Sequence, residues 1–435
     1  MDAVNIVITL TIDSLAFGGN GVGRCEGKAI FVPDTAPGDT VRCRIRRNKG
    51  RYAEAELVEV IDPSPLRRTP PCPYAGRCGG CQWQHLDDAA QSDWKARLFA
   101  DTLSRHAGVD GGVKPFVAAP EPFAYRSRIQ FKCRQSENGF VLGFYRKGSH
   151  YVIDIDACPV ADRRINDLIP QIKAWLAASP APQQIPQVDV AVDDEGALRL
   201  VVHQIHPADP SLVDYLRQLA LREGLNLFLQ QGRKNTLTKL HGDENLFIHP
   251  LGDASQRLAY GPGGFSQINL AQNRRLVQAV LEAANLKGDE RVLDLFCGMG
   301  NFSLPLARQA KEVVGVEDYS PSIAMARYNA EVNTIKNAIF HACDSAEALD
   351  DLTAQESFDL VLLDPPRSGA YAVMKSLQRL KVPRLLYVSC DPPSLARDLK
   401  PLIHGGYRLV SSQGFDLFPQ TYHTESLTIL ERTSA

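Results

Sequence analysis

Four cysteines of this chain have the spacing of metal ligands. Cys72, Cys78 and Cys81 lie in one short segment, with five and then two residues between them, and Cys158 comes far downstream before a proline. Three thiolates in one loop can hold one face of an iron–sulfur cluster, which a distant fourth thiolate completes. Structural zinc is the alternative, although zinc ribbons usually carry two CxxC pairs and this segment has one. The pattern therefore favours a cluster over zinc.

A second set of residues has the pattern of a nucleoside-cofactor site. The segment RVLDLFCGMG predicts a buried strand that runs into a turn with Gly298 and Gly300 and then into a helix. Glycines there let the backbone approach a ligand at the edge of a sheet. The next predicted strand ends in Glu317, where an acid can bind both ribose hydroxyls. The D-x-F-C-G-x-G spacing suits S-adenosylmethionine better than NAD, because a sulfonium cofactor has no pyrophosphate that needs a helix N-terminus.

Three further residues lie at the ends of predicted strands in the same region. Asp364 follows the apolar run FDLVLL, and the two prolines after it stiffen the loop that holds its carboxylate at the sheet edge. Cys390 ends the next strand, at the edge where open α/β sheets bind their ligands. Glu425 comes just before the last strand. A turn-forming Asp-Pro, a buried structural cysteine and a surface glutamate are the simpler explanations.

Two segments are rich in cations. Residues 42–51 contain six Lys and Arg and no acid, which suits contact with an RNA backbone or a solvated hairpin whose charges prevent edge pairing. Residues 125–151 interleave six cations with aromatic side chains such as Tyr145 and Tyr151, against one acid, Glu137. That pattern suits a platform for single-stranded RNA. An ordinary strand pair, with aromatics inward and cations outward, is the alternative.

The elements that must position these residues divide the chain into three parts. Residues 1–61 alternate with period two between Gly and Pro turns, which predicts a small closed β-barrel. After a Pro-rich stretch, residues 62–262 mix strand-like runs with a helix that ends at a glycine, which predicts an α+β domain that contains the cysteine loop. In residues 263–435, nearly continuous apolar strands alternate with helices, which predicts a doubly wound, Rossmann-like parallel sheet.

Composition limits the classes of function. The chain has 435 residues, and its net charge of −2 excludes binding of nucleic acid by bulk charge alone. Any RNA-binding surface must therefore be local. The sequence has no run of about eighteen apolar residues and no basic signal region at its start. We therefore expect a cytoplasmic protein with free thiols and no membrane partner.

With these motifs the chain resembles the RNA uracil-C5 methyltransferases over nearly its whole length. DLFCGMGNFSLPLA, LDPPRSGA, VSCDPPSLARDL and FPQTYHTES are similar to the signatures of that family, and GGNGVGR with TAPGDTVRCRI resembles a TRAM domain, an OB-like RNA-binding module. The resemblance implies that residues 263–435 form a class I methyltransferase domain. The added TRAM domain and four cysteines most resemble the branch that modifies 23S rRNA, because the tRNA branch generally lacks both.

The resemblance also implies roles for individual residues. The ligands of a [4Fe–4S] cluster are matched by Cys72, Cys78, Cys81 and Cys158. Contacts to S-adenosylmethionine or to the target base are matched by Gln267, Phe296, Asn301, Glu317, Asp344 and Asp364, with Asp344 in the loosest match. Cys390 matches the nucleophile and Glu425 the general base. The family commonly has Asn after this cysteine and this chain has Asp391, so we expect that carboxylate to point away from the thiol.

The reaction implied is methylation of C5 of a uridine to give 5-methyluridine. Because C5 is a weak nucleophile, Cys390 would add to C6, and after methyl transfer Glu425 would remove the C5 proton. The target must leave its stack, so the expected partner is a single-stranded or looped-out uridine of 23S rRNA, bound by a monomer. Three alternatives stay open: a tRNA uracil methyltransferase, an amino-group methyltransferase with a DPPY-like loop, and a non-catalytic iron–sulfur RNA-binding protein.

Overall fold

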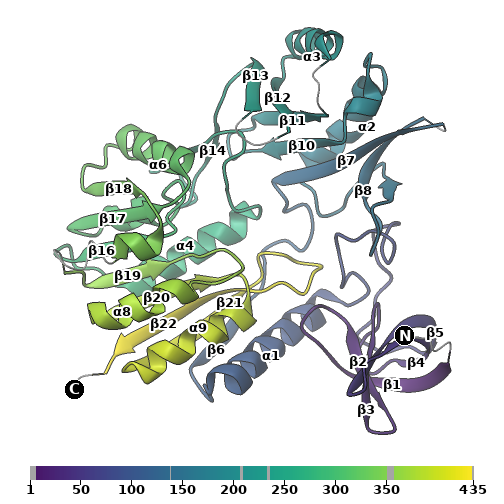
Figure 1. Cartoon of the computed structure of the whole chain (residues 1–435), viewed down its shortest axis with the longest axis horizontal. Coiled ribbons are helices and arrows are strands. Elements are labelled where there is room, and N and C mark those ends of the chain that lie inside the picture. The colour runs from purple at the N-terminus through teal and green to yellow at the C-terminus, as the bar shows by residue number, and fades with distance from the viewer. Residues whose placement is uncertain (1–5, 138, 206–208, 233–235, 350–356, 434–435) are drawn as a thin grey trace.

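The computed structural model describes residues 6–137, 139–205, 209–232, 236–349 and 357–433. Figure 1 shows three parts: a small N-terminal barrel, a central sheet with two helices, and a larger C-terminal sheet with helices. The connection between β21 (Tyr407–Phe415) and β22 (Glu425–Arg432), drawn in yellow, leaves the large sheet and reaches toward the middle of the molecule.

The N-terminal part is a closed five-stranded barrel, as the sequence predicts. Its strands follow the order β1-β2-β3-β5-β4. Their bounds are β1 (Val7–Leu15), β2 (Gly21–Cys25), β3 (Lys28–Val32), β4 (Thr40–Asn48) and β5 (Tyr52–Asp62). Along β4, Val41, Cys43 and Ile45 point into the core, so the arginines between them point outward. This alternation is the physical reason that the barrel could be predicted from the sequence.

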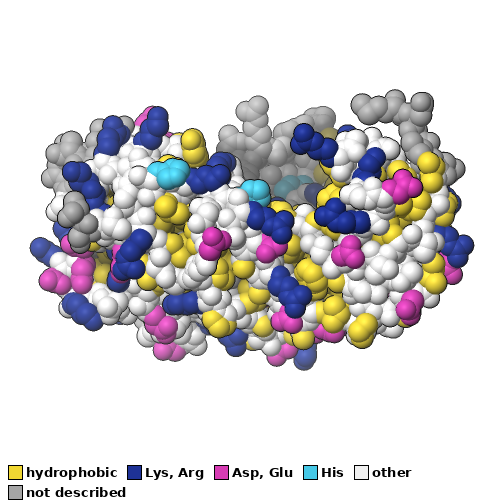
Figure 2. Space-filling view, turned by 90° about the horizontal axis from the view of Figure 1, so that it is seen from below, with side chains coloured by type: hydrophobic (Ala, Val, Ile, Leu, Met, Phe, Trp, Pro, Cys, Tyr) yellow, Lys and Arg dark blue, Asp and Glu magenta, His cyan; other side chains and the backbone are white. Residues whose placement is uncertain are grey.

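The arginines of β4 face the acids of the neighbouring strand β5. Arg44 and Arg46 pair with Glu56 at 3.1 and 2.5 Å, Arg42 pairs with Glu59, and Arg47 lies 3.6 Å from Glu54. Exposed pairs of this kind contribute roughly 0–1 kcal/mol each, so they stabilise the hairpin only weakly. The three glutamates offset half of the six positive charges in residues 42–51. Figure 2 likewise shows Lys and Arg interspersed with Asp and Glu rather than gathered into one patch.

The central part is a seven-stranded sheet in the order β13-β12-β11-β10-β7-β8-β9. Its strands are β7 (Arg128–Ser136), β8 (Gly139–Tyr145), β9 (Val152–Asp154), β10 (Gln187–Val192), β11 (Leu198–Gln204), β12 (Asn226–Gln231) and β13 (Leu237–His241). α2 (Arg163–Ala177) and α3 (Pro210–Glu223) share one apolar core with this sheet, and η1 (Pro182–Gln184) is a short turn beside it. β14 (Leu246–Ile248) and β15 (Leu258–Tyr260) form a separate pair.

The C-terminal part is an eight-stranded sheet in the order β18-β17-β16-β19-β20-β22-β21-β6. β16 (Arg291–Leu295), β17 (Glu312–Glu317), β18 (Ala338–Ala342), β19 (Leu360–Leu363) and β20 (Arg384–Ser389) are parallel. β22 is antiparallel to both of its neighbours, β20 and β21. The helices are α4 (Leu270–Ala284), α5 (Ser303–Ala307), α6 (Ser320–Val332), η3 (Tyr371–Val373), α8 (Met374–Leu380) and α9 (Pro392–His404). Alternate side chains of β16 belong to two different cores, so both faces of the sheet are covered.

One helix and one strand from the predicted central region pack on this C-terminal sheet. α1 (Asp88–Ala107) begins at the N-cap Asp87 and ends at Gly108, whose φ of +70° favours glycine. Phe99 and Leu103 of α1 lie in the same core as β16 and α9. β6 (Val113–Val117) pairs with β21 at the edge of the sheet. The C-terminal fold thus includes residues before the predicted boundary at 263, because strand pairing between distant segments leaves no local pattern.

Among the described helices, none has the length and apolar character needed to cross a membrane.

Candidate active site and cysteine-lined cavity

The turn after β16 is shaped to bring the backbone close to a ligand. Phe296, Gly298 and Gly300 have φ values of +66°, +55° and +92°, in the left-handed region that favours glycine. A side chain at Gly300 would meet Leu304 at 2.9 Å, whereas a side chain at Gly298 would enter open space. Gly298 therefore leaves a free approach to the edge of the sheet, as the sequence pattern suggests.

Three carboxyl groups converge beside this turn. Asp294 is fully buried, Glu317 ends β17, and the N–H of Asp364 donates to the carbonyl of Leu295 at 3.2 Å. Burial, followed by the charges of its neighbours, raises the pKa of Asp364 to about 8, and burial raises the pKa of Asp294 to about 7. One oxygen of Asp294 has no partner among the described residues. Three carboxyls in one place form a site that a cationic ligand would stabilise.

Glu317 is oriented by the backbone. Its carboxylate accepts N–H groups from Gly298 at 3.3 Å and from Tyr319 at 3.0 Å, and burial raises its pKa. Because Gly298 belongs to the turn after β16, these bonds fix the carboxylate of Glu317 against that turn. The position at the end of the second strand is the one expected for an acid that binds ribose hydroxyls.

The remaining predicted cofactor residues lie at different depths. Gln267 is buried in the segment before α4, and Asn301 exchanges two hydrogen bonds with Asn273, at 2.9 and 3.1 Å. Asp344 is exposed just after β18, where it accepts the N–H of Ala346 at 2.8 Å. Phe296, Glu317, Asp344, Asp364 and Cys390 thus lie at the carboxyl ends of five adjacent parallel strands.

Cys390 and Glu425 occupy facing positions on neighbouring strands. The ladder between β20 and β22 ends at the pair Ser389 and Ser426, so Cys390, the residue after β20, and Glu425, the first residue of β22, lie one position beyond it. Burial, followed by the charge of Glu425, raises the pKa of Cys390 to about 12. Glu425 is 2% exposed, and burial followed by the charge of Asp364 raises its pKa well above the usual range. The thiol and the carboxyl group therefore lie near each other at the same edge of the sheet.

Asp391 is turned toward the helix that follows it. Its carboxylate caps α9 by accepting the N–H of Ser394 at 3.0 Å. The charge of Asp391 still raises the pKa of Cys390, although it is the smallest of the influences on that thiol.

Arg367 is a residue of this site that the sequence reasoning did not assign. It follows the two prolines after Asp364, and its cation lowers the pKa of both Cys390 and Glu425, which partly opposes the effect of burial. The signal was present in the sequence, because the motif is DPPR and the arginine is carried by the same stiff loop as Asp364. A guanidinium here can stabilise negative charge on the thiol or on a bound ring.

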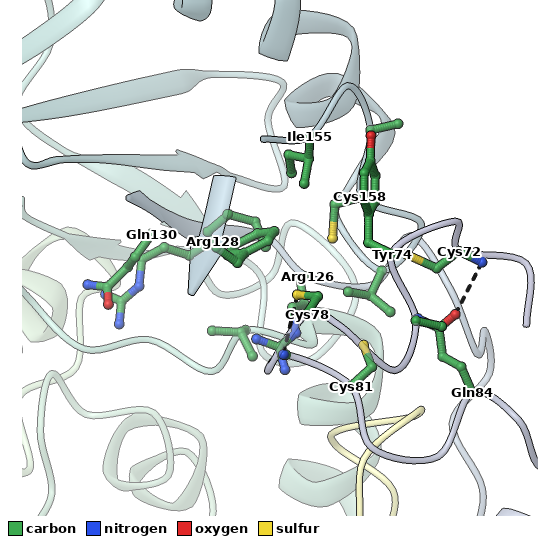
Figure 3. A pocket seen from close by; sticks show the side chains of 17 residues that line it. Cys72, Tyr74, Cys78, Cys81, Gln84, Arg126, Arg128, Gln130, Ile155 and Cys158 are labelled. Atoms are coloured by element: carbon green, nitrogen blue, oxygen red, sulfur yellow. Dashed lines mark hydrogen bonds between the residues drawn. The ribbon is translucent and has the colours of Figure 1, made fainter. Parts of the chain in front are cut away.

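The four predicted ligand cysteines line one cavity of about 340 Å³ between the loop at 72–84 and the central sheet. Figure 3 shows them around this space, with Arg126 beside Cys78 and Gln84 bonded to the backbone of Cys72 at 3.3 Å. The N–H of Gly80 donates to the sulfur of Cys78 at 3.4 Å, and the Arg126 cation lowers the pKa of Cys78, Cys81 and Cys158 against the larger effect of burial.

The four cysteines do not form a compact metal site in the described part of the chain. Within the described residues, no three His, Cys, Asp or Glu side chains converge closely enough to hold a single metal ion. Four thiols around one cavity are the donor atoms that an iron–sulfur cluster takes in proteins.

The aromatic side chains of the basic segment at 125–151 lie partly in the core and partly at the surface. Phe131 is fully buried and packs on Phe144, with ring centroids 5.4 Å apart, as the ordinary strand-pair interpretation expects. Tyr145 and Tyr151 are instead 40% and 64% exposed, and the ammonium group of Lys132 lies 5.5 Å from the ring centre of Tyr145. The outward side chains of this segment keep the aromatic and cationic character that single-stranded RNA can use.

Two parts of the chain match known protein families, and the whole chain is similar to known proteins. Residues 112–433 match the family described as tRNA (Uracil-5-)-methyltransferase, and residues 4–58 match the TRAM domain. The 23S rRNA (uracil(1939)-C(5))-methyltransferase RlmD of Pectobacterium atrosepticum is 36% identical over 428 residues, which cover 97% of this chain and 93% of that protein. The protein of the same name from Aeromonas hydrophila subsp. hydrophila is 37% identical, with 98% and 96% covered.

A solved structure agrees in fold. The tRNA (uracil-54, C5)-methyltransferase of Pyrococcus abyssi, crystallised with S-adenosyl-L-homocysteine, superposes with a TM-score of 0.74 at 25% identity. The match covers 97% of this chain and 100% of that chain. The arrangement of barrel, central sheet and C-terminal sheet is thus shared with a protein that was solved with the demethylated form of the cofactor.

Proposed function

This chain belongs to the tRNA (uracil-5-)-methyltransferase family, and on that premise we propose that it methylates C5 of one uridine in 23S rRNA. Activity as an RNA uracil-5-methyltransferase and use of S-adenosylmethionine follow from the family. The observation that carries the finer proposal is the facing pair of Cys390 and Glu425 beside three converging carboxyl groups. A thiol and an acid are the two groups that this reaction requires.

Cys390 is the proposed nucleophile. Its thiolate would form a bond to C6 of the uracil, which makes the ring an enolate with nucleophilic C5. S-adenosylmethionine, when bound, supplies an electrophilic methyl group on a sulfonium centre. Asp364 would orient the ring by accepting its N3–H, and Arg367 would stabilise the negative charge that develops on the ring.

Glu425 is the proposed general base. Once C5 carries both the methyl group and its proton, Glu425 would take that proton, the bond between C6 and the Cys390 sulfur would break, and the ring double bond would return. Both groups must be ionised for their steps, although burial favours their neutral forms. Arg367 lowers the pKa of each, and so favours ionisation where it is needed.

The residues around the glycine turn would hold the cofactor. Glu317 suits the ribose hydroxyls, and the unpartnered oxygen of Asp294 lies among carboxylates that suit a cationic ligand. Four further residues complete the proposed cofactor-binding set because they lie at the sheet edge or before α4: Phe296, Asn301, Gln267 and Asp344. Asp344 remains the weakest member, because its carboxylate is exposed and occupied with its own helix turn.

A [4Fe–4S] cluster bound by Cys72, Cys78, Cys81 and Cys158 is part of the proposal. The support for it is the sequence spacing of the four cysteines and the one cavity that they line. Such a cluster would tie the loop after the barrel to the central sheet, since Cys158 precedes α2 and the other ligands precede α1. Its role would be structural.

The RNA target can be decided by assay. The RlmD relatives act on 23S rRNA by name, whereas the Pyrococcus abyssi neighbour acts on tRNA by name, so tRNA is the second candidate. We expect the purified protein to methylate 23S rRNA and not tRNA, and a deletion strain to lack one 5-methyluridine in 23S rRNA. Methylation of tRNA alone would instead establish the second candidate. Action as a monomer and location in the cytoplasm stay predictions.

A further inference from the structure

The connection that leads into Glu425 is held by one buried glutamine. Gln420 lies in the segment between β21 and β22, is 0% exposed, and has a backbone φ of +70°. A non-glycine residue in the left-handed region is strained and persists only where surrounding contacts impose it. The contacts of Gln420 show what imposes it here.

Every polar group of Gln420 has a partner, and the partners come from separate segments. Its carbonyl accepts the N–H groups of Gln82 and Trp83, both at 3.0 Å, directly after the ligand candidate Cys81. Its N–H donates to the side-chain oxygen of Gln91 in α1 at 2.9 Å.

The side chain of Gln420 is equally occupied. Its oxygen accepts from Arg68 at 2.7 Å and from the Gln91 amide at 3.0 Å. Its amide donates to Asp88 at 3.0 Å and to the carbonyl of Pro122 at 3.2 Å. The residue therefore bonds the catalytic segment to the cysteine loop, to α1 and to the linkers on both sides.

Neighbouring contacts hold the same segment from other directions. Lys95, fully buried in α1, pairs with Asp416 at 2.7 Å and donates to the carbonyl of Phe418 at 3.1 Å. Tyr422 packs edge-on against Phe17 of the barrel. The strand ladder begins at Glu425 itself, so the residues before it depend on these contacts for their position.

We propose that Gln420 is a positioning residue that fixes Glu425 in its place opposite Cys390, and that links this placement to the cysteine loop. The inference rests on the proposed role of Glu425 as base. A shift of about 1 Å in a catalytic group can reduce a rate about 100-fold. The step that should suffer is removal of the C5 proton, because addition of Cys390 to C6 depends on a different strand end.

The test separates the two steps with RNA that carries tritium at C5 of uridine. Covalent adduct on denaturing gels reports addition of Cys390, and release of tritium reports proton removal. In Gln420→Ala we expect adduct formation within about threefold of the original rate, tritium release slowed roughly 10- to 100-fold, and accumulation of methylated adduct. The milder variant Asp88→Ala, at a partly exposed residue, should show the same change to a smaller degree.

A paired variant provides the rescue. Gln420→Glu places a carboxylate against Asp88 and should slow tritium release. Adding Asp88→Asn supplies an amide donor to that carboxylate and should recover release in part, because the bond to the carbonyl of Pro122 stays lost. Asn337→Ala is the matched control, because Asn337 donates to the carbonyls of Ala307 and Ala310 elsewhere in the same domain. It should lower Tm without changing the ratio of adduct to release.

Two results overturn the proposal. One is a fall in adduct formation and in tritium release together, in proportion to the loss of Tm. The other is no recovery in the paired variant. If instead Glu425→Gln itself releases tritium normally, the base assignment fails, and that outcome is distinct from a failure of Gln420 as positioning residue.

Discussion

Cys390 directly follows β20 and Glu425 begins β22, so the two residues lie one position beyond Ser389 and Ser426, the pair that ends the ladder between these strands. Side chains directly opposite on antiparallel strands lie on the same face, within roughly 5 Å at their Cβ atoms. The charge of Glu425 is accordingly the largest influence on the pKa of Cys390 after burial. In the proposed mechanism, Cys390 and Glu425 would act in turn on C6 and C5, which are adjacent atoms of one ring.

Substitutions of Cys390 and of Glu425 should block the reaction at different steps. Cys390→Ala is expected to abolish both the covalent RNA adduct and methyl transfer, because the bond to C6 cannot form. Glu425→Gln is expected to form the methylated adduct and to accumulate it, because the C5 proton is not removed. Denaturing gels with tritiated RNA measure both. A Glu425→Gln protein without trapped RNA would contradict the assignment of Glu425 as base.

The free enzyme should have an unreactive Cys390. A pKa of about 12 leaves roughly one thiol in 10⁵ ionised at pH 7, so alkylation by iodoacetamide should be slow and should rise steadily from pH 8 to pH 10. Glu425→Gln removes a negative charge that raises the pKa of Cys390. The alkylation rate at a given pH should therefore increase about tenfold for each unit by which the pKa of Cys390 falls. Peptide mass spectrometry identifies the labelled cysteine. An unchanged rate in Glu425→Gln would show that burial alone controls the thiol.

Much of the fold follows from local sequence pattern. Alternation along β4 puts Val41 and Ile45 inside and arginines outside, so the barrel could be predicted from that segment alone. The parallel strands that end near Glu317, Asp364 and Cys390 are apolar runs between helices, so their shared edge was also predictable. The ion pairs of Arg42, Arg44 and Arg46 with β5 were not, because strand register decides which acid faces which arginine.

The candidate site, like the fold, could be predicted from the sequence only in part. A lone glutamate before a strand has no local signal of function, so the role proposed for Glu425 came from resemblance, and its nearness to Cys390 came only from the pairing of β20 with β22. Gln420 was invisible for a similar reason, since its partners Gln82, Asp88 and Gln91 lie far away in the sequence. The docking of α1 and β6 on the C-terminal sheet creates these contacts, and only tertiary structure reveals it.

Asp364→Asn should lower methyltransferase activity and should stabilise the folded protein at high pH. Asp364 has a pKa of about 8 in the folded protein and about 3.9 when unfolded, so the folded state binds more protons between these values and loses stability as the pH rises through them. Asn is uncharged at every pH, so the Asp364→Asn protein does not lose this stability as the pH rises. Tm should match the original protein near pH 4 and exceed it by about 3 °C or more at pH 8. The exposed Asp101→Asn is the control, and equal Tm differences at both pH values would contradict the prediction.

The cysteine cavity should hold iron rather than zinc. Protein purified without oxygen is expected to be brown and to contain about four iron atoms per chain. Cys158→Ala should lose colour and iron because Cys158 lines the cavity, whereas Cys133→Ala should keep both because the Cys133 thiol is buried in β7 outside it. Iron analysis and visible spectra decide the question. A colourless protein with one zinc per chain would overturn the cluster.

RNA affinity should depend on the two basic segments to different degrees. Each cation that contacts a phosphate contributes about 0.7–0.9 to the slope of log K against log salt. Arg134 is exposed on β7 of the central sheet, so Arg134→Ala should reduce the slope by about that amount. Arg44 is already paired with Glu56, so Arg44→Ala should change the slope less. Filter binding of an RNA fragment at several salt concentrations measures both. If Arg44→Ala lowers the slope as much as Arg134→Ala, the barrel contacts the RNA backbone through β4 despite its ion pairs, and the basic run at 42–51 is a binding surface rather than a solvated hairpin.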